Sequence, residues 1–260
     1  YDSLKEYQKA IADYDKAIAI NPQLALAYNN RGNTYNSLKE YQKAIADSDK
    51  AIALEPKMGI AYNNRGNAYK ALKEYPKAIA DYDTAIAINP RYAKAYFNRG
   101  NTYELLEDYL KSIADLDQAV AINPQFADAY YSRGVVYTRL KDYPKAIIDY
   151  SKAIAINPQY ADVYYSRGVV YLFQKDYQKA ITDYDKAIAI NPKHAEAYNN
   201  RGFTYFILNQ YPKAIADLNK AIAMNPQNTK AYENRGAIYL KKGEKTKAKQ
   251  DLETAAQIYR

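Results

Sequence analysis

The stretch AYNNRGNTYNSLKEYQKAIADSDKAIALEP, from Ala27 to Pro56, returns almost unchanged as AYNNRGNAYKALKEYPKAIADYDTAIAINP from Ala61 to Pro90. A fixed repeat period indicates a linear array of structural units, although a chain of 260 residues could also form one or two globular domains. The dipeptide Arg-Gly marks each copy at intervals of 34 residues, at Arg31, Arg65, Arg99, Arg133, Arg167, Arg201 and Arg235.

Each copy contains two segments in which apolar or small residues recur at helical spacing. In the first copy these segments span residues 25–38 and 41–54, and Tyr28, Gly32 and Tyr35 follow the helical period in the first of them. The short link at residues 39–40 predicts an antiparallel pair of helices. The dipeptide Asn89-Pro90 ends a second helix, because the residue before proline avoids the helical conformation.

Prolines and glycines are consistent with these boundaries. Pro76, Pro144 and Pro212 fall in the first turn of a second helix, where a missing amide donor costs nothing. The glycine after each repeated arginine stands opposite Ala44 or its equivalent, so the two helices of a repeat are expected to approach closely there.

This pattern of positions resembles the tetratricopeptide repeat, with tyrosine where that family often has tryptophan. The resemblance covers essentially the whole chain and implies a right-handed superhelical solenoid of antiparallel helix pairs, with the first helices lining a concave face. An all-α solenoid also follows from stacked helical hairpins, each of which contacts only its neighbours. The matching residues of one repeat are Tyr28, Gly32, Tyr35, Ala44, Ala51 and Pro56.

The period divides the chain into three parts. Residues 1–24 form a partial leading repeat that supplies only a second helix, and Tyr1 is in register with Tyr35. Six full repeats occupy residues 25–228. A seventh repeat occupies residues 229–260, where Lys245 and Lys249 replace the apolar residues of the preceding second helix and predict a polar, basic cap.

Residues equidistant from the turn of an antiparallel hairpin face each other, so each repeated arginine is expected beside an aspartate of the second helix. We predict a structural, bidentate ion pair between the two helices of a repeat. The alternative is an anion-binding ladder of arginines. The predicted pairs of the first three full repeats are Arg31 with Asp47, Arg65 with Asp81, and Arg99 with Asp115.

The residue inventory argues against an enzyme. The chain has no cysteine, and its single histidine, His194, stands where other repeats have Tyr92 or Tyr160, so it is expected to pack. Carboxylates in triplets such as Asp13 to Asp15 lie on different helical faces and form no acid–base pair. Glycines 34 residues apart cannot cradle a phosphate, so we expect no catalytic residue, no metal and no cofactor.

The net charge of +8 makes nucleic acid a rival partner. Lysines and aspartates alternate along most second helices, however, which indicates a mixed outer face and makes nucleic-acid binding the less favoured alternative. Only residues 229–260 carry a clear excess, eight basic residues against four acidic ones, which fits either a cap or an acidic partner. No apolar run is long enough to cross a bilayer, and we favour a soluble, cytoplasmic protein.

The first-helix positions that packing does not use should line the groove. One column of them is mostly asparagine and resembles the asparagine ladder with which some tetratricopeptide arrays hold the backbone of an extended peptide, since an amide can donate and accept at once. The alternative is solvated surface with hydrogen bonds to neighbouring helices. The column comprises Asn30, Asn64, Asn98, Ser132, Ser166, Asn200 and Asn234, and Asn33, Asn67 and Asn101 lie beside it.

In the later repeats the groove positions become apolar, and a contiguous apolar strip normally marks a binding surface. We predict a two-part groove in which asparagines hold a peptide backbone while Tyr165, Phe173 and Phe206 receive apolar side chains as aromatic anchors. Val135, Val169 and Phe203 could instead be hidden by packing against the adjacent first helix. The strip comprises Tyr131, Val135, Tyr165, Val169, Leu172, Phe173, Phe203, Phe206 and Ile207.

The sequence thus predicts a non-enzymatic scaffold that binds a protein or an extended peptide in its groove. Capture of a chaperone tail through the carboxylate clamp of some tetratricopeptide domains is not expected, because Asn29 and Asn98 stand where that clamp has a lysine and an arginine. The alternative is an architectural or self-assembling module. Self-association would use the apolar face of the leading helix, which comprises Tyr7, Ile11, Tyr14 and Ile18.

Overall fold

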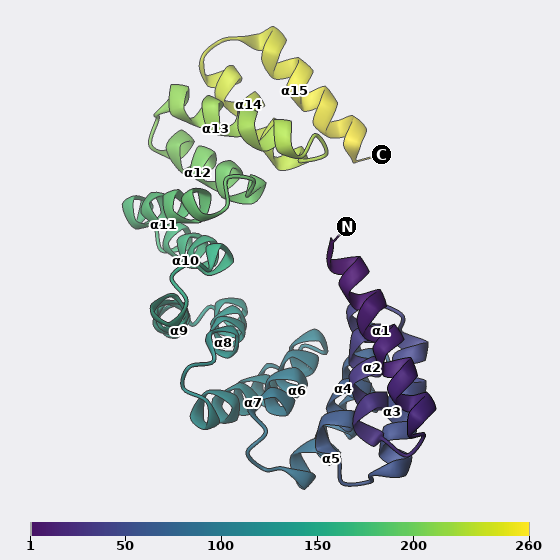
Figure 1. The fold of residues 1–260 in the computed structure, drawn as a ribbon. Helices are drawn as coiled ribbons and strands as arrows, with labels where there is room; N and C mark the ends of the chain where they lie inside the picture. Colours follow the sequence, from purple (N-terminus) through teal and green to yellow (C-terminus); the bar gives the residue numbers. More distant parts are fainter. Residues whose placement is uncertain (1, 260) are drawn as a thin grey trace. The chain divides into compact units, whose positions relative to one another are not determined.

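The computed structural model describes residues 2–259, which form fifteen α-helices and no strand (Figure 1). The all-α prediction is therefore confirmed for this part of the chain. Tyr1, which is in register with Tyr35, and Arg260, one of the basic residues of the last repeat, lie outside the described residues. A leading helix, α1 (Asp2–Ile20), is followed by alternating first and second helices.

The first helices each contain 13 residues: α2 (Ala25–Ser37), α4 (Gly59–Ala71), α6 (Ala93–Leu105), α8 (Ala127–Arg139), α10 (Ala161–Phe173), α12 (Ala195–Ile207) and α14 (Thr229–Lys241). The second helices each contain 14 residues: α3 (Tyr41–Leu54), α5 (Tyr75–Ile88), α7 (Tyr109–Ile122), α9 (Tyr143–Ile156), α11 (Tyr177–Ile190), α13 (Tyr211–Met224) and α15 (Lys245–Ile258).

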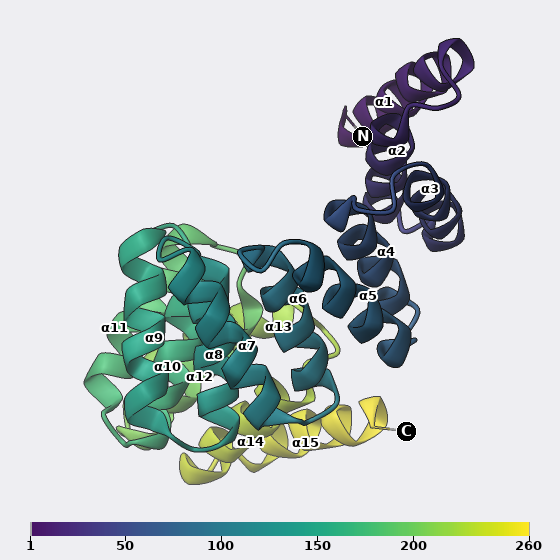
Figure 2. The same ribbon diagram turned by 90° about the horizontal axis from the view of Figure 1, so that it is seen from below.

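The chain divides into two compact units, residues 1–136 and residues 137–260. Within the first unit the helices pack in chain order, and α4 also contacts the first helices on both sides of it, α2 and α6 (Figure 2). The same order holds in the second unit, where α12 contacts both α10 and α14. In each unit, therefore, three successive first helices lie side by side: α2, α4 and α6 in the first, and α10, α12 and α14 in the second.

The link between the two helices of a repeat is a tight left-handed turn. Lys39 has φ of 61°, and the amides of Lys39 and Glu40 donate to the carbonyls of Asn36 and Tyr35 at 3.0 and 2.9 Å. This pair of bonds satisfies carbonyls that the end of a helix leaves without intrahelical partners. The short link forces the next helix to run back antiparallel, as the sequence predicts.

Proline positions mark both ends of the second helices. Pro76, Pro144 and Pro212 occupy the first turn of α5, α9 and α13, as predicted. At the other end of α5, Asn89 leaves the helix with φ −133° and ψ 94°, the extended conformation that a following proline imposes. Local sequence therefore sets where these helices start and stop.

The glycine after each repeated arginine lies at the closest approach of the two helices. A Cβ atom at Gly32 would be 3.2 Å from the carbonyl oxygen of Ala44. At Gly168 the tighter neighbour is the ring of Tyr184, 2.7 Å from such an atom. The predicted contact between small residues is thus supplemented in some repeats by a buried aromatic ring.

The core combines buried alanines with larger apolar and aromatic side chains. In residues 2–136 one cluster joins Leu116, Ala119, Val120, Ala129 and Val136. In residues 137–259 another joins Tyr198, Ala214, Leu218, Ala221, Ala231 and Ile238. The first cluster connects α7 to α8, and the second connects α13 to both α12 and α14, so burial occurs within and between repeats.

Ser112 is the one member of its repeat column that is not alanine, and we expect Ser112→Ala to stabilise the protein. The side chain is fully buried, and its hydroxyl has no hydrogen-bond partner in the protein. Removing an unpartnered buried hydroxyl should raise the free energy of unfolding by about 1 kcal/mol. Urea denaturation checks this, with Ser151→Ala as a control that removes a hydroxyl bonded to Arg167. A decrease for Ser112→Ala would contradict the prediction.

Candidate functional site

The repeated arginines lie between the two helices of their repeats. Arg65 donates from Nε to Asp81 Oδ2 at 2.9 Å and from Nη2 to Asp81 Oδ1 at 2.6 Å. The structure brings together all three predicted pairs in this bidentate form: Arg31 with Asp47, Arg65 with Asp81, and Arg99 with Asp115. The side chain of Asp81 is only 7% exposed, so the charge of Arg65 is neutralised in a largely buried position.

Each arginine also reaches back to the second helix of the preceding repeat, a contact that the sequence analysis missed. Arg65 Nη1 donates to Asp49 Oδ1 at 2.6 Å, and Arg31 Nη1 donates to Asp15 Oδ1 at 2.5 Å. The signal was present in the Asp-x-Asp motif. In Asp47-Ser48-Asp49, the first carboxylate lies 16 residues after Arg31 and the second lies 16 residues before Arg65.

We call each arginine with its two partners a rung. The rung partner on the preceding second helix is an aspartate at Asp15, Asp49, Asp83, Asp117 and Asp185. Two rungs differ: Arg167 Nη1 donates to the hydroxyl of Ser151 at 2.9 Å, and Arg235 Nη1 donates to the amide oxygen of Asn219 at 2.5 Å.

The environment of the arginines fits a structural role. The hydrogen bond to Asp81 is the largest effect on the pKa of Arg65 and raises it above the ordinary value, against the opposing effect of burial. The guanidinium also lies 5.5 Å from the ring centre of Tyr62, within the range of a cation–π contact. In a rung with two carboxylates the charged edges of the arginine are already occupied, which disfavours the anion-binding alternative.

An early groove lies along α2, α4 and α6. It is a cavity of about 210 Å³ lined mainly by amides, and it includes five of the predicted asparagines. The lining residues are Asn29, Asn30, Asn33, Ile60, Asn63, Asn64, Asn67, Tyr92, Lys94 and Asn98.

Several of these asparagines also join neighbouring repeats. Asn64 Nδ2 donates to Asn29 Oδ1 and Asn98 Nδ2 donates to Asn63 Oδ1, both at 2.9 Å. Asn64 and Asn98 are 5% and 8% exposed, so packing takes up most of their surface, whereas Asn33 is exposed. Two other predicted groove residues, Asn101 on α6 and Tyr131 on α8, are half-buried and do not line this cavity.

A larger, later groove lies along α10, α12 and α14, with a cavity of about 760 Å³. Its wall combines the predicted apolar residues of α10 with amides and charged groups of α12 and α14. The lining residues are Tyr165, Val169, Leu172, Phe173, Glu196, Asn199, Asn200, Phe203, Asn225, Gln227, Asn228, Thr229, Lys230, Glu233 and Asn234.

Phe173 and Phe203 are the phenylalanines of the later groove. Phe173 is 57% exposed and stacks on Tyr143 with a ring-centre distance of 5.9 Å. Phe206 is not among the residues that line this cavity: its ring centre lies 6.1 Å from that of Tyr211 and 6.5 Å from that of Phe203, and its role as an anchor stays a prediction. Phe203, which belongs to the predicted apolar strip, lines the cavity.

The amides of the later groove continue the pattern of the early one. Asn200 Nδ2 donates to the hydroxyl of Tyr165 at 3.2 Å, and Asn234 Nδ2 donates to Asn199 Oδ1 at 3.3 Å. Both donors are half-buried, so each is bonded to the adjacent repeat while lining the groove. The groove therefore has a fixed polar side and an apolar side.

His194 is the N-cap residue of α12, and its ring packs against Tyr165 of the later groove. Its Nδ1 accepts from the amide of Ala197 at 3.3 Å, and its ring centre lies 4.8 Å from that of Tyr165. The side chain is 8% exposed. This position matches the packing role expected for the single histidine.

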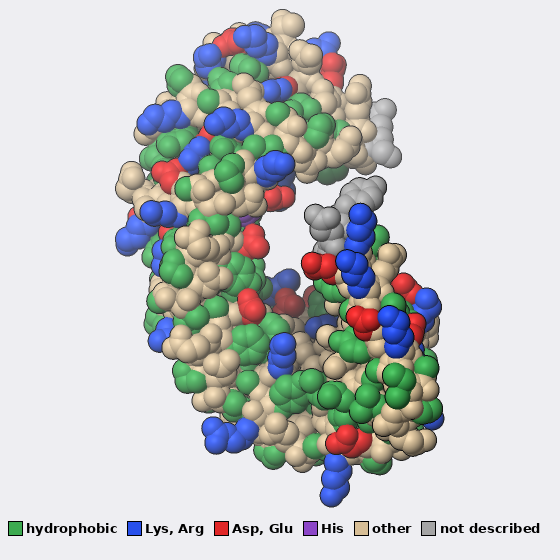
Figure 3. Space-filling model, viewed as in Figure 1, with side chains coloured by type: hydrophobic (Ala, Val, Ile, Leu, Met, Phe, Trp, Pro, Cys, Tyr) green, Lys and Arg blue, Asp and Glu red, His purple; other side chains and the backbone are tan. Residues whose placement is uncertain are grey.

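Charges of both signs are interspersed on the face of the molecule shown in Figure 3. In the described part of the chain, no three histidine, cysteine, aspartate or glutamate side chains gather where they could hold a metal ion. None of the helices within residues 2–259 is both long and apolar enough to span a membrane. On α1, Tyr7 is 37% exposed, and self-association through that helix stays a prediction.

Family comparisons cover nearly the whole chain. A model described as Tetratricopeptide repeat matches residues 25–58, 93–126, 127–160, 161–194 and 195–228. A second model of that description matches residues 218–250, and one described as TPR repeat matches residues 1–39 and 66–107. No curated protein matches the chain.

Several solved structures are similar. YrrB, described as a TPR protein with an unusual peptide-binding site, is 28% identical over 71% of this chain and 95% of its own, with a TM-score of 0.55. MamA is 28% identical over 64% of this chain and 96% of its own, with a TM-score of 0.59. A tetratricopeptide repeat protein from Parabacteroides merdae shares the fold at 21% identity, with coverage of 90% and 93% and a TM-score of 0.67.

Proposed function

The chain belongs to the tetratricopeptide repeat family, whose members generally mediate protein–protein interactions, and we propose that it is a non-enzymatic scaffold that binds an extended protein segment in the later groove. The observation that carries this proposal is the cavity of about 760 Å³ along α10, α12 and α14. Ligand sites in proteins typically have about 300–1,000 Å³ and combine apolar walls with a few fixed polar groups.

The two sides of the later groove suit the two parts of a peptide. Phe173, Val169 and Phe203 form an apolar wall that can receive a large apolar side chain. Asn200 and Asn234 are held by bonds to the adjacent repeat, and their remaining amide capacity can pair with a peptide backbone. Such preorganised amides lose little conformational freedom when a ligand binds.

The early groove is proposed as a second, smaller contact site for peptide backbone. Asn33 is exposed, while Asn30 and Asn67 are half-buried, so these three present more amide surface than Asn64 and Asn98 do. The peptide-binding site described for YrrB, at 28% identity, supports a peptide as the kind of ligand to expect here.

The test is a peptide selection followed by matched substitutions. Short random peptides are selected on the immobilised chain, and the affinity of a selected peptide is measured by fluorescence anisotropy. We expect selected peptides to carry a large apolar residue and Phe173→Ala to weaken binding at least about tenfold, because aromatic anchors dominate binding energy. Leu110→Ala is the control, since Leu110 of α7 is 81% exposed and does not line this cavity.

Melting curves of both variants show whether each is folded, so that a loss of binding can be distinguished from a loss of structure. If Phe173→Ala folds as well as the parent chain and binds the selected peptide equally well, the later groove is not the binding site. Selection of peptides without any apolar preference would equally count against the proposal.

A further inference from the structure

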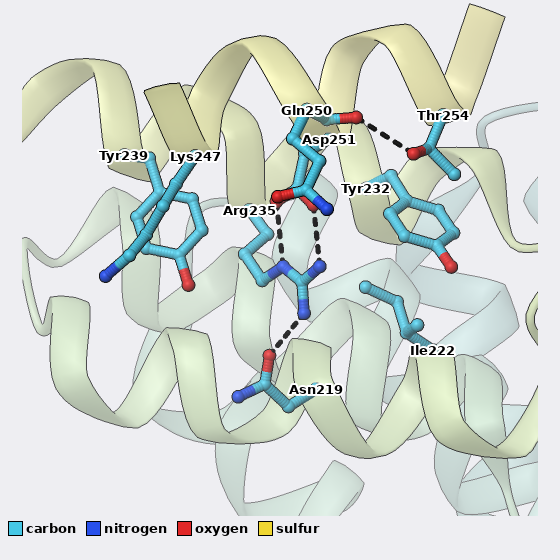
Figure 4. A pocket seen from close by; sticks show the side chains of 9 residues that line it. All are labelled: Asn219, Ile222, Tyr232, Arg235, Tyr239, Lys247, Gln250, Asp251 and Thr254. Atoms are coloured by element: carbon cyan, nitrogen blue, oxygen red, sulfur yellow. Dashed lines mark hydrogen bonds and ion pairs between the residues drawn. The ribbon is translucent and has the colours of Figure 1, made fainter. Parts of the chain in front are cut away.

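The seventh rung, like the fifth, lacks the second aspartate, and it borders a cavity of its own. Figure 4 shows Arg235 of α14 between Asp251 of α15 and Asn219 of α13. The cavity around them has a volume of about 520 Å³. It uses Tyr232, Arg235 and Tyr239 of α14, whereas the later groove uses Glu233 and Asn234 of the same helix. This site is therefore separate from the proposed peptide groove.

The guanidinium of Arg235 has one carboxylate where a complete rung has two. Its Nε and Nη2 donate to Asp251 at 2.8 and 2.6 Å, and its Nη1 donates to the amide oxygen of Asn219 at 2.5 Å. The same nitrogen of Arg31, Arg65, Arg99, Arg133 and Arg201 faces an aspartate. The seventh rung thus lacks one negative charge at a position where this fold repeatedly places a carboxylate.

The other charged residues that line the cavity do not replace the missing negative charge. Lys247 lies on the wall, 5.4 Å from the ring centre of Tyr239, and is paired with Glu244 at 2.7 Å. Arg235 is paired with Asp251, so the paired charges sum to zero, whereas a rung with two aspartates carries one net negative charge. Asn219 is exposed and its side chain borders the cavity, so a ligand can reach Nη1 from solvent.

We propose that this cavity binds a carboxylate side chain of an acidic peptide segment. The carboxylate takes the position of the absent aspartate and accepts from Arg235 Nη1, displacing the neutral amide oxygen of Asn219. A hydrogen bond from arginine to an ionised carboxylate is stronger than one to a neutral amide oxygen. Lys247 and the Gln250 amide lie on the same wall and offer further donors, while the Tyr232 ring can contact the aliphatic part of the side chain.

The substitution Asn219→Asp tests the proposal, because it restores the aspartate found in most other rungs. The new carboxylate would occupy the position proposed for the carboxylate of the ligand. The probe is a fluorescent glutamate-rich peptide, titrated into the full chain at moderate salt while the Nε–H signal of Arg235 is followed by NMR. The parent chain should bind and shift that signal. Asn219→Asp should weaken binding at least tenfold and should melt no lower than the parent.

Two controls separate this site from general electrostatic attraction. Gln257→Glu adds the same charge at an exposed position of α15 and should leave the affinity unchanged. A glutamine-rich peptide of equal length should not bind. Equal affinity in Asn219→Asp and the parent chain, an equal loss in Gln257→Glu, or no shift of the Arg235 signal would each overturn the proposal.

Discussion

Replacing Asp81 by alanine is expected to lower the free energy of unfolding by about 3 kcal/mol, because it leaves a largely buried guanidinium without its bidentate partner. Asp81 is 7% exposed and Arg65 20% exposed at the side chain, so water replaces the lost carboxylate poorly. The melting temperature should fall by on the order of 10 °C for a chain of this size. Thermal unfolding and urea denaturation, both followed by circular dichroism, measure the effect.

The matched control acts on the other partner of the same arginine. Asp49 accepts one hydrogen bond from Arg65 and its side chain is 53% exposed. Exposed ion pairs are worth at most about 1 kcal/mol, so Asp49→Ala should cost far less than Asp81→Ala. Equal losses in the two variants would contradict the view that the bidentate pair inside the repeat is the stabilising one.

Adding a single methyl group at Gly168 is expected to destabilise the protein by about 2 kcal/mol through overpacking. The new Cβ atom would lie 2.7 and 2.9 Å from two ring atoms of Tyr184 and 3.3 Å from the carbonyl oxygen of Ala180. Tyr184 is fully buried and cannot move aside. The loss should appear although alanine is intrinsically better than glycine in a helix by about 1 kcal/mol.

Gly236→Ala is the control for this prediction, since it makes the same change at the equivalent position of α14. Its nearest neighbours are Leu252 Cγ and Cδ2 at 3.2 and 3.3 Å. Leu252 is 39% exposed and can rotate, so we expect Gly236→Ala to be neutral or stabilising. A loss of similar size in both variants would mean that the tyrosine ring is not the cause, and urea denaturation distinguishes the two outcomes.

The helices and their order could be read from the sequence because their signals are local. Pro76 starts a helix and Asn89 ends one through the conformation of single residues, and the same signals recur every 34 residues. The pair of Arg65 with Asp81 could also be predicted, because both residues are counted from one short turn. Across such a turn, chain geometry alone determines which residues meet.

The contacts between repeats were decided by the tertiary structure. The bond from Arg65 to Asp49 joins two hairpins, so it depends on how far one hairpin is displaced along the next, which no turn fixes. The same stacking brings the amide nitrogen of Asn64 within hydrogen-bond distance of Asn29. Asn64 therefore has fewer hydrogen-bonding groups available to a ligand in the groove.

The choice between Phe203 and Phe206 shows the remaining limit of the helical pattern. Residues three apart lie on nearly the same face of a helix, so spacing alone cannot tell which one points into the groove. The rotation of α12 against α10 and α13 places Phe203 in the cavity and Phe206 against Tyr211. Sequence thus determined the repeat and its internal pairs, whereas the packing of one repeat on the next decided which side chains stay available to a partner.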